Sequence, residues 1–152
     1  MYQTMANAPG LLKMYLYGYQ QFRETSEFTP VEQEVIFMVI SRENGCEYCV
    51  GAHSFIADNM SGVPEHVTDA IRDGNSIDDP KLEALAIFTR TMLSTRGVPT
   101  KSDVESFISA GYSERQVLEI ILAIAVKTLS NYSNHVCQPE LDDVFSNRAW
   151  SA

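Results

Sequence analysis

Apolar residues recur along the chain at helical spacing, and residues typical of helix ends separate the apolar segments. The clearest start follows Thr29-Pro30, where a capping threonine, a proline at the first helical position and Glu32 together predict a helix. This helix would run to about Glu43, and its centre, 35–40, is apolar on all sides, as in a buried helix. Its β-branched residues alone would also fit a strand, but the capping residues and the length favour a helix.

The rest of the chain repeats this pattern of apolar segments and turn residues. Asn44-Gly45 ends the helix just described and Gly62 ends the next, because glycine readily adopts the left-handed conformation found after helices. The helices are expected at about 11–22, 30–43, 46–60, 64–72, 79–96, 100–110 and 113–129. No segment alternates as a strand does, and no long linker is present. The prediction is an all-α fold, a single-domain helical bundle over residues 1–152.

The two halves of the chain align weakly with each other. Phe28-Thr29 aligns with Tyr112-Ser113, and the segment 46–49 aligns with 130–133. Two related helical hairpins, of which only the first has cysteines, would give this match. Any two capped apolar helices would give it as well, and the sequence leaves both explanations open.

The composition of the chain excludes some classes of function. The 152 residues are 45% hydrophobic, which suits one compact domain. Acidic residues outnumber basic ones by 20 to 11, and a net charge of −9 argues against binding the phosphates of nucleic acid. No apolar run approaches the roughly 20 residues that cross a membrane, and the first residues do not resemble a secretory signal. We therefore expect a cytoplasmic protein that binds neither nucleic acid nor membrane.

The three cysteines are too few for a disulfide framework. In a reducing compartment, a close pair such as Cys46 and Cys49 indicates redox chemistry or metal binding. Cys137 has no motif around it, and we expect it to pack as a small apolar side chain.

A histidine lies on the same helix face as the cysteine pair. Cys46, Cys49 and His53 are spaced three and four residues apart, so they share one face of the expected helix. Ile56 and Met60 continue this face, which indicates that it turns inward. The thiols and the imidazole should then be partly buried and should have polar partners.

Glu34 is the expected partner of the histidine. At about 1.5 Å of rise per residue, Glu34 lies roughly 15 Å before the Asn44-Gly45 turn and His53 roughly 12 Å after it. If the two helices fold back on each other, Glu34 comes level with His53. The order along the contact is then Glu34, His53, Cys49 and Cys46, the order that a proton relay requires.

This order predicts thiol chemistry that needs no bound cofactor. The thiolate is the nucleophilic form of cysteine, and both a helix N-terminus and a neighbouring base favour it. His53 would accept the Cys49 proton, while Glu34 would orient the imidazole and favour its charged form. The Cys49 thiolate could attack a peroxide oxygen to give a sulfenic acid, and Cys46 could then condense with it to a disulfide.

Two other chemistries remain open at this point. The same three side chains, Cys46, Cys49 and His53, could be ligands of a zinc ion in a structural helical module. Such a site needs a fourth ligand, for which the candidates are Cys137, His135 and His66. Alternatively, His53 could act as a base in a non-redox isomerase or decarboxylase acting on a lactone.

The spacing Glu34-x11-Cys46-x2-Cys49-x3-His53 resembles the motif of the AhpD-like and carboxymuconolactone decarboxylase-like superfamily, over roughly residues 8–140. The resemblance implies an AhpD-like helical bundle and a thiol-dependent peroxidase that reduces small hydroperoxides. It makes Cys49 the peroxidatic cysteine, Cys46 the proton donor and resolving thiol, and Glu34 and His53 the relay. A dithiol reductant would restore the pair.

Tyr48 stands where the peroxidase branch commonly has a histidine, so the chain looks more like the peroxidase-related members than like the alkylhydroperoxidase with its lipoyl-linked partner. The decarboxylase branch lacks the cysteine pair, which speaks against a lactone-converting enzyme. The resemblance also implies a homo-oligomer, a trimer or hexamer. Position in the possible repeat suggests four pocket residues: Tyr48, Tyr132, Asn134 and His135.

Overall fold

The computed structural model describes all 152 residues and contains helices and turns but no strand. The helices are α1 (Tyr2–Met5), α2 (Pro9–Thr25), α3 (Pro30–Glu43), α4 (Glu47–Ile56), the π-helical turn η1 (Ala57–Ser61), α5 (Glu65–Asp73), α6 (Pro80–Ser94), α7 (Lys101–Ser109), α8 (Glu114–Cys137) and the 3-10 helix η2 (Asp143–Arg148). The predicted all-α fold is confirmed.

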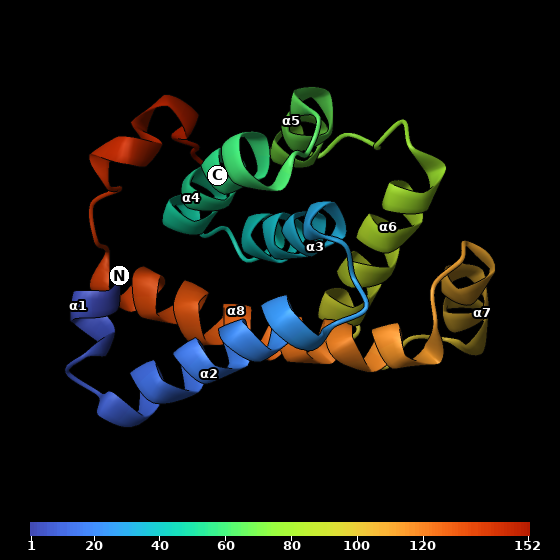
Figure 1. Ribbon diagram of the computed structural model, residues 1–152, viewed down its shortest axis with the longest axis horizontal. Coiled ribbons are helices and arrows are strands. Elements are labelled where there is room, and N and C mark those ends of the chain that lie inside the picture. Colours follow the sequence, from blue (N-terminus) through green and yellow to red (C-terminus); the bar gives the residue numbers. More distant parts are fainter.

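Helix α3 forms the centre of the molecule, with α2, α4, α5, α6 and α8 around it (Figure 1). It begins after Thr29, whose side chain accepts from the Glu32 backbone while Glu32 reaches back to Thr29, so the predicted capping box is present. Residues 35–40 have no measurable exposure. The β-branched segment is therefore a helix buried on all sides.

Helix α4 follows α3 after a tight turn in which Gly45 has a φ of +66°. It continues into η1 and ends at Gly62, with a φ of +71°. The expectation that Met60 faces inward is wrong, because this side chain is 75% exposed. The wider π-helical turn changes the angular position of the residues that follow Ile56, so the helical spacing no longer applies there.

Helix α8 is longer than the pattern predicted. It was expected to end near Leu129 but continues for about two more turns to Cys137, with 24 residues in all. It is unbroken where the repeat alignment would place the counterpart of the Asn44-Gly45 turn, so the second half contains no matching hairpin. Neither α8 nor any other helix is long and apolar enough to span a membrane.

The segment after α8 folds back over α4 (Figure 1). Its helix η2 packs on α4, with the Phe145 ring centroid 5.5 Å from that of Phe55. Arg148 forms ion pairs of 2.7 Å with Asp58 and 2.9 Å with Asp69. The C-terminal segment 138–152 is thus fixed against the helix that contains the cysteine pair.

Candidate active site

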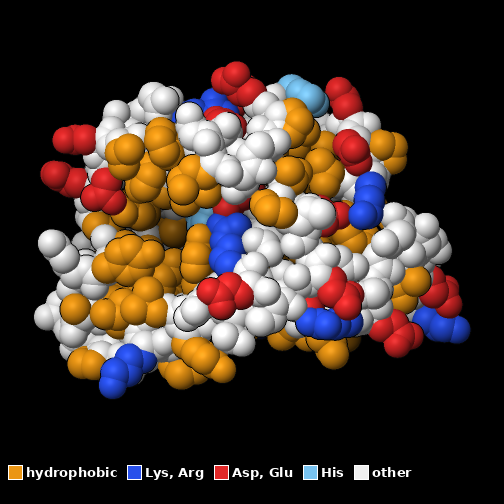
Figure 2. Space-filling view, in the orientation of Figure 1, with side chains coloured by type: hydrophobic (Ala, Val, Ile, Leu, Met, Phe, Trp, Pro, Cys, Tyr) orange, Lys and Arg blue, Asp and Glu red, His pale blue; other side chains and the backbone are white.

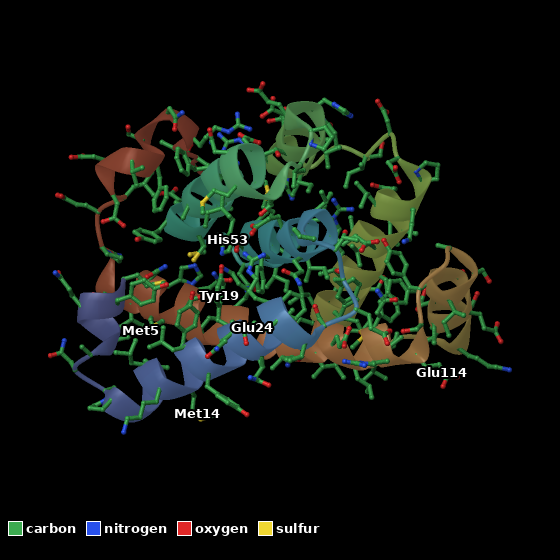
Figure 3. The ribbon with its side chains drawn as sticks, viewed as in Figure 1. Met5, Met14, Tyr19, Glu24, His53 and Glu114 are labelled. Atoms are coloured by element: carbon green, nitrogen blue, oxygen red, sulfur yellow. The ribbon has the colours of Figure 1, made fainter.

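The α3–α4 pair brings Glu34 and His53 together as predicted. The His53 Nδ1 atom lies 2.8 Å from Glu34 Oε2, and both side chains are buried. In Figure 3, His53 on α4 and Tyr19 on α2 lie on the facing sides of these helices. Cys46 is the N-cap residue of α4, and Cys49 lies in its first turn.

Glu34 has a second partner that the sequence did not indicate. The Arg23 guanidinium, from α2, pairs with the other oxygen of the carboxylate and also donates to the Tyr19 hydroxyl at 2.8 Å. Burial opposes the charge on Glu34, but His53 and Arg23 outweigh it, so the pKa of Glu34 is lowered. Glu34 is therefore a carboxylate at neutral pH. Arg23 also lies over the Phe37 ring, with its guanidinium carbon 4.8 Å from the ring centroid.

His53 is neutral, because two other effects outweigh Glu34, which favours its charged form as expected. Burial is the largest cause that lowers the pKa of His53, and the Lys127 charge lowers it further. Glu34 acts in the opposite direction but shares its charge with Arg23. Because an ionised carboxylate can only accept hydrogen bonds, the His53 Nδ1 must be the donor. The Nε2 atom then has a free lone pair and can accept a proton.

The pKa values of the two thiols of the pair are shifted in opposite directions. A hydrogen bond from the Cys46 thiol is the largest cause that lowers the pKa of Cys49 well below its usual value. Burial opposes this shift, and the Lys127 charge adds to it. The same hydrogen bond, together with burial, strongly raises the pKa of Cys46. Cys49 is therefore the thiolate and Cys46 the protonated thiol.

No hydrogen bond joins His53 to either sulfur. His53 instead lies with Cys49 on the wall of one cavity, so a small molecule in that cavity can reach both groups. The relay order predicted from helix rise therefore holds directly for Glu34 and His53. His53 and Cys49 share the cavity without a direct contact, and Cys46 does not line it.

Helix α8 contributes the remaining polar groups around the sulfurs. The Asn134 Nδ2 atom lies 3.2 Å from the Cys49 sulfur and 3.7 Å from that of Cys46. Asn131 also helps to lower the pKa of Cys49, although its buried amide nitrogen forms no hydrogen bond of ordinary geometry. Lys127 is 1% exposed. Asn134 was among the predicted pocket residues, whereas Lys127 and Asn131 were missed.

The cavity beside Cys49 has a volume of about 350 Å³ and mostly aromatic and aliphatic walls. Figure 2 shows a hollow on this face between groups of hydrophobic side chains. The side chains around the cavity come from the N-terminus, α2, α4, α8 and the C-terminal segment: Met1, Tyr2, Gln3, Tyr15, Tyr19, Tyr48, Cys49, Ala52, His53, Ile56, Lys127, Asp142 and Phe145.

The other predicted residues lie outside this cavity, except Tyr48. Cys46 and His135 line a separate surface hollow together with Asn134. Tyr132 is 59% exposed and lines neither of these two spaces. The expectation that Cys137 is packed inside is wrong, since it is exposed in the last turn of α8, beyond the main core.

The zinc alternative finds no support in the geometry. No group of three or more His, Cys, Asp or Glu side chains is arranged to hold a metal ion. The His53 Nδ1 atom is already bonded to Glu34, and Cys46 and Cys49 face different spaces.

No family model and no curated protein matches the chain. Several solved structures are similar to it. An alkylhydroperoxidase AhpD core protein of Ralstonia eutropha JMP134, an uncharacterized peroxidase-related protein, has a TM-score of 0.82 and 21% identity, covering 93% of this chain and 76% of that one. An uncharacterized peroxidase-related protein of Silicibacter sp. TM1040 has a TM-score of 0.79 and 18% identity, covering 90% and 73%.

A third similar structure is that of the debrominase Bmp8, solved as a cysteine-to-alanine variant in complex with 2,3,4-tribromopyrrole. It has a TM-score of 0.79 and 18% identity, covering 95% of this chain and 77% of that one. At these identities the similarities establish the fold. The chain has the AhpD-like helical fold that the motif implied, with a cysteine pair at the start of α4.

Proposed function

We propose that the protein is a thiol-dependent peroxidase that reduces a hydroperoxide to an alcohol, with Cys49 as the nucleophile. The observation that best supports this proposal is the asymmetry of the pair. The Cys49 sulfur, at the cavity wall, is favoured as a thiolate, while the Cys46 thiol beside it stays protonated. A nucleophile and a resolving thiol are the two groups that the reaction needs.

The reaction would proceed in two steps. The Cys49 thiolate attacks one oxygen of the hydroperoxide, so that a sulfur–oxygen bond forms, the oxygen–oxygen bond breaks, and the leaving alkoxide takes up a proton from water to become the alcohol. Cys46, which lines a surface hollow, then loses its proton to water and attacks the sulfenic sulfur, so that a sulfur–sulfur bond forms and the sulfur–oxygen bond breaks. The displaced hydroxide recovers this proton and leaves as water, and an external dithiol reduces the resulting disulfide.

The cavity favours an organic hydroperoxide over hydrogen peroxide. Its volume of about 350 Å³ is within the usual range of small-molecule sites. Tyr15, Tyr19 and Phe145 present aromatic surface that a compact aromatic or branched alkyl group can cover. Hydrogen peroxide would leave most of this surface in contact with water.

The test is thiol loss upon addition of cumene hydroperoxide. In the wild type each equivalent should remove both thiols of the pair. Cys49→Ser should abolish the loss, and Cys46→Ser should stop at a sulfenic acid on Cys49, detected by mass. Cys137→Ser, which changes an exposed thiol, should behave as the wild type. Thiol loss that persists in Cys49→Ser would overturn the proposal.

Reductive dehalogenation is a second candidate, because a debrominase shares the fold and the cavity is lined by aromatic rings. Here the Cys49 thiolate would take the halogen from an aromatic ring, the ring carbon would take up a proton, and Cys46 would displace halide to form the disulfide. Halide release from a brominated pyrrole, without thiol loss to hydroperoxides, would favour this candidate over the first.

A further inference from the structure

Lys127 is a buried cation without an acidic partner. Its side chain lines the cavity that Cys49 and His53 share, and it forms neither an ion pair nor a hydrogen bond within the protein. Its ammonium nitrogen lies over the Phe37 ring, 5.6 Å from the ring centroid. Buried charges normally have a counter-charge, so the position of Lys127 calls for a nearby anion.

This anion can be identified by pairing each charged group at the site with a group of opposite charge. The Glu34 carboxylate is matched by the Arg23 guanidinium, and the His53 ring is neutral. Lys127 is then the one buried cation left without an anion. The Asp142 carboxylate also lines the cavity, but it accepts a hydrogen bond from the Tyr48 hydroxyl and forms no ion pair with Lys127. Burial keeps the hydroxyls of Tyr15 and Tyr48 protonated, so Cys49 is the other group beside the cavity that can supply the matching negative charge.

Two amides on the same helix approach the same sulfur. Asn134 donates to Cys49 at 3.2 Å. The Asn131 amide nitrogen is buried without a hydrogen bond of ordinary geometry, and Asn131 helps to lower the pKa of Cys49. Lys127, Asn131 and Asn134 are spaced four and three residues apart, so they lie on one face of α8. One helix face thus directs a cation and two amide donors towards the cysteine pair.

We propose that this face of α8 is a binding site for the Cys49 thiolate, with Lys127 as counter-ion and Asn131 and Asn134 as donors. The site stabilises the reduced pair more than the disulfide, which has no negative charge to bind. Stabilising the thiolate of the reduced form raises the reduction potential of a disulfide. The oxidised pair should therefore accept electrons readily from an ordinary external thiol. The inference concerns the pair itself and holds whether a hydroperoxide or a halogenated ring is the oxidant.

The charged and titratable groups around Cys49 come from every element that packs against the site: the α-amino group of Met1, Tyr2 on α1, Tyr15, Tyr19 and Arg23 on α2, Glu34 on α3, Cys46 at the N-cap of α4, Tyr48 and His53 on α4, Lys127 on α8 and Asp142 in the C-terminal segment. Of these, Arg23 is already paired with Glu34. Met1 is not among the buried residues, so removing the Lys127 charge removes the one buried positive charge at the site that has no ion-pair partner.

The first experiment measures how fast iodoacetamide alkylates Cys49 as a function of pH, with the modified peptide identified by mass. Lys127→Met removes the charge from a side chain of similar length, and an apolar side chain suits this buried position. The rate at about pH 6.5 should fall about tenfold or more, because a lost counter-ion raises the pKa of the thiol. Lys127→Arg should recover most of the rate. Lys101→Met changes the net charge equally on exposed α7 and should leave the rate unchanged.

The second experiment measures the equilibrium of the pair with glutathione. In Lys127→Met, the equilibrium constant for reduction of the disulfide should fall about tenfold, equivalent to about 30 mV. Asn134→Leu, which removes a donor but no charge, should shift both measurements in the same direction by less.

Two results would overturn the inference. One is an unchanged pH profile of alkylation in both Lys127→Met and Asn134→Leu. The other is unchanged alkylation with a raised KM for carboxylate-bearing substrates alone, which would make Lys127 a ligand for substrate. Neither measurement on the pair requires peroxide turnover, so a failure here is distinguishable from a failure of the proposed peroxidase activity.

Discussion

His53 is the residue whose protonation state the structure changes most relative to the sequence-based expectation. A carboxylate beside a histidine usually favours the imidazolium. Here the carboxylate is already matched by Arg23, and the imidazole is buried close to the Lys127 cation. The neutral ring is what a proton acceptor needs at neutral pH, because only the neutral ring has a free lone pair.

This neutral state makes stability depend on pH in a predictable direction. The pKa of His53 in the folded protein lies below the usual 6.5, so between these values the unfolded chain binds more protons than the folded one. The free energy of unfolding should therefore decrease as the pH falls below about 6.5. Each tenfold difference in proton affinity corresponds to about 1.4 kcal/mol, or about 3–6 °C in Tm.

Thermal unfolding at about pH 7.5 and about pH 5.5 measures this effect. His53→Asn should lose less Tm than the wild type on acidification, whereas His66→Asn, which changes an exposed histidine, should follow the wild type. Equal Tm losses in the wild type and His53→Asn would contradict a neutral, buried His53.

Single residues show how far spacing can predict a site. Helix α4 and its N-cap contain Cys46, Cys49 and His53, and Glu34 lies on the preceding helix, which a short turn joins to α4. Helix geometry alone therefore predicts how these residues lie relative to one another. Arg23 and Lys127 come from helices distant in sequence, and their contacts depend on the packing of α2 and α8. The one feature of the sequence that could have indicated Lys127 is the presence of a lysine inside the apolar segment 117–129.

Among the elements, helix starts were better predicted than helix ends. The starts at Thr29, Thr100 and Ser113 each have a reciprocal capping box, which depends on local residues alone. Helix α8 instead ends at Gln138, which has a left-handed φ of +46° without being a glycine. The last two turns of α8, which include Asn131 and Asn134, were therefore missing from the predicted helix.

The position of α8 depends on its contact with α2. Substituting alanine for two glycines of α2 should therefore have opposite effects on the free energy of unfolding. A β-carbon on Gly18 would lie 2.9 Å from Val126 Cγ2, and a β-branched side chain in a helix has little freedom to move away. Gly18→Ala should lower the free energy of unfolding by about 1–3 kcal/mol, partly offset by up to about 1 kcal/mol of helix propensity.

Gly10→Ala is the matched control, because a β-carbon there meets nothing within 4 Å. This variant should be unchanged or up to about 1 kcal/mol more stable. Urea unfolding measures both variants. An increase in stability for Gly18→Ala would show that α2 and α8 can separate without loss, and that α8 is less tightly fixed than the structure indicates.

At the scale of the whole molecule, apolar side chains remain on the outer faces of two helices: Met14, Leu16 and Tyr17 on α2, and Leu118, Ile121, Tyr132 and Val136 on α8. Assembly into a homo-oligomer would cover some of this surface, but it stays a prediction for solution measurements of mass. A second feature at this scale is the enclosure of the cavity, whose wall includes both the first residues of the chain and part of the C-terminal segment 138–152.

The C-terminal segment closes one side of the cavity through Asp142 and Phe145, and Arg148 fixes it to Asp58 and Asp69. Arg148→Ala should release this wall while leaving the cysteine pair in place on α4. We expect Cys49 to react several times faster with a bulky maleimide, while its reaction with small iodoacetamide changes by less than about twofold, since access limits the larger reagent alone. Arg115→Ala removes ion pairs of a similar kind on the surface at the start of α8 and should change neither rate. If Arg148→Ala increases the rates of both reagents by the same factor, the segment affects the acidity of the thiol and does not control access. Its role as a wall of the site is then wrong.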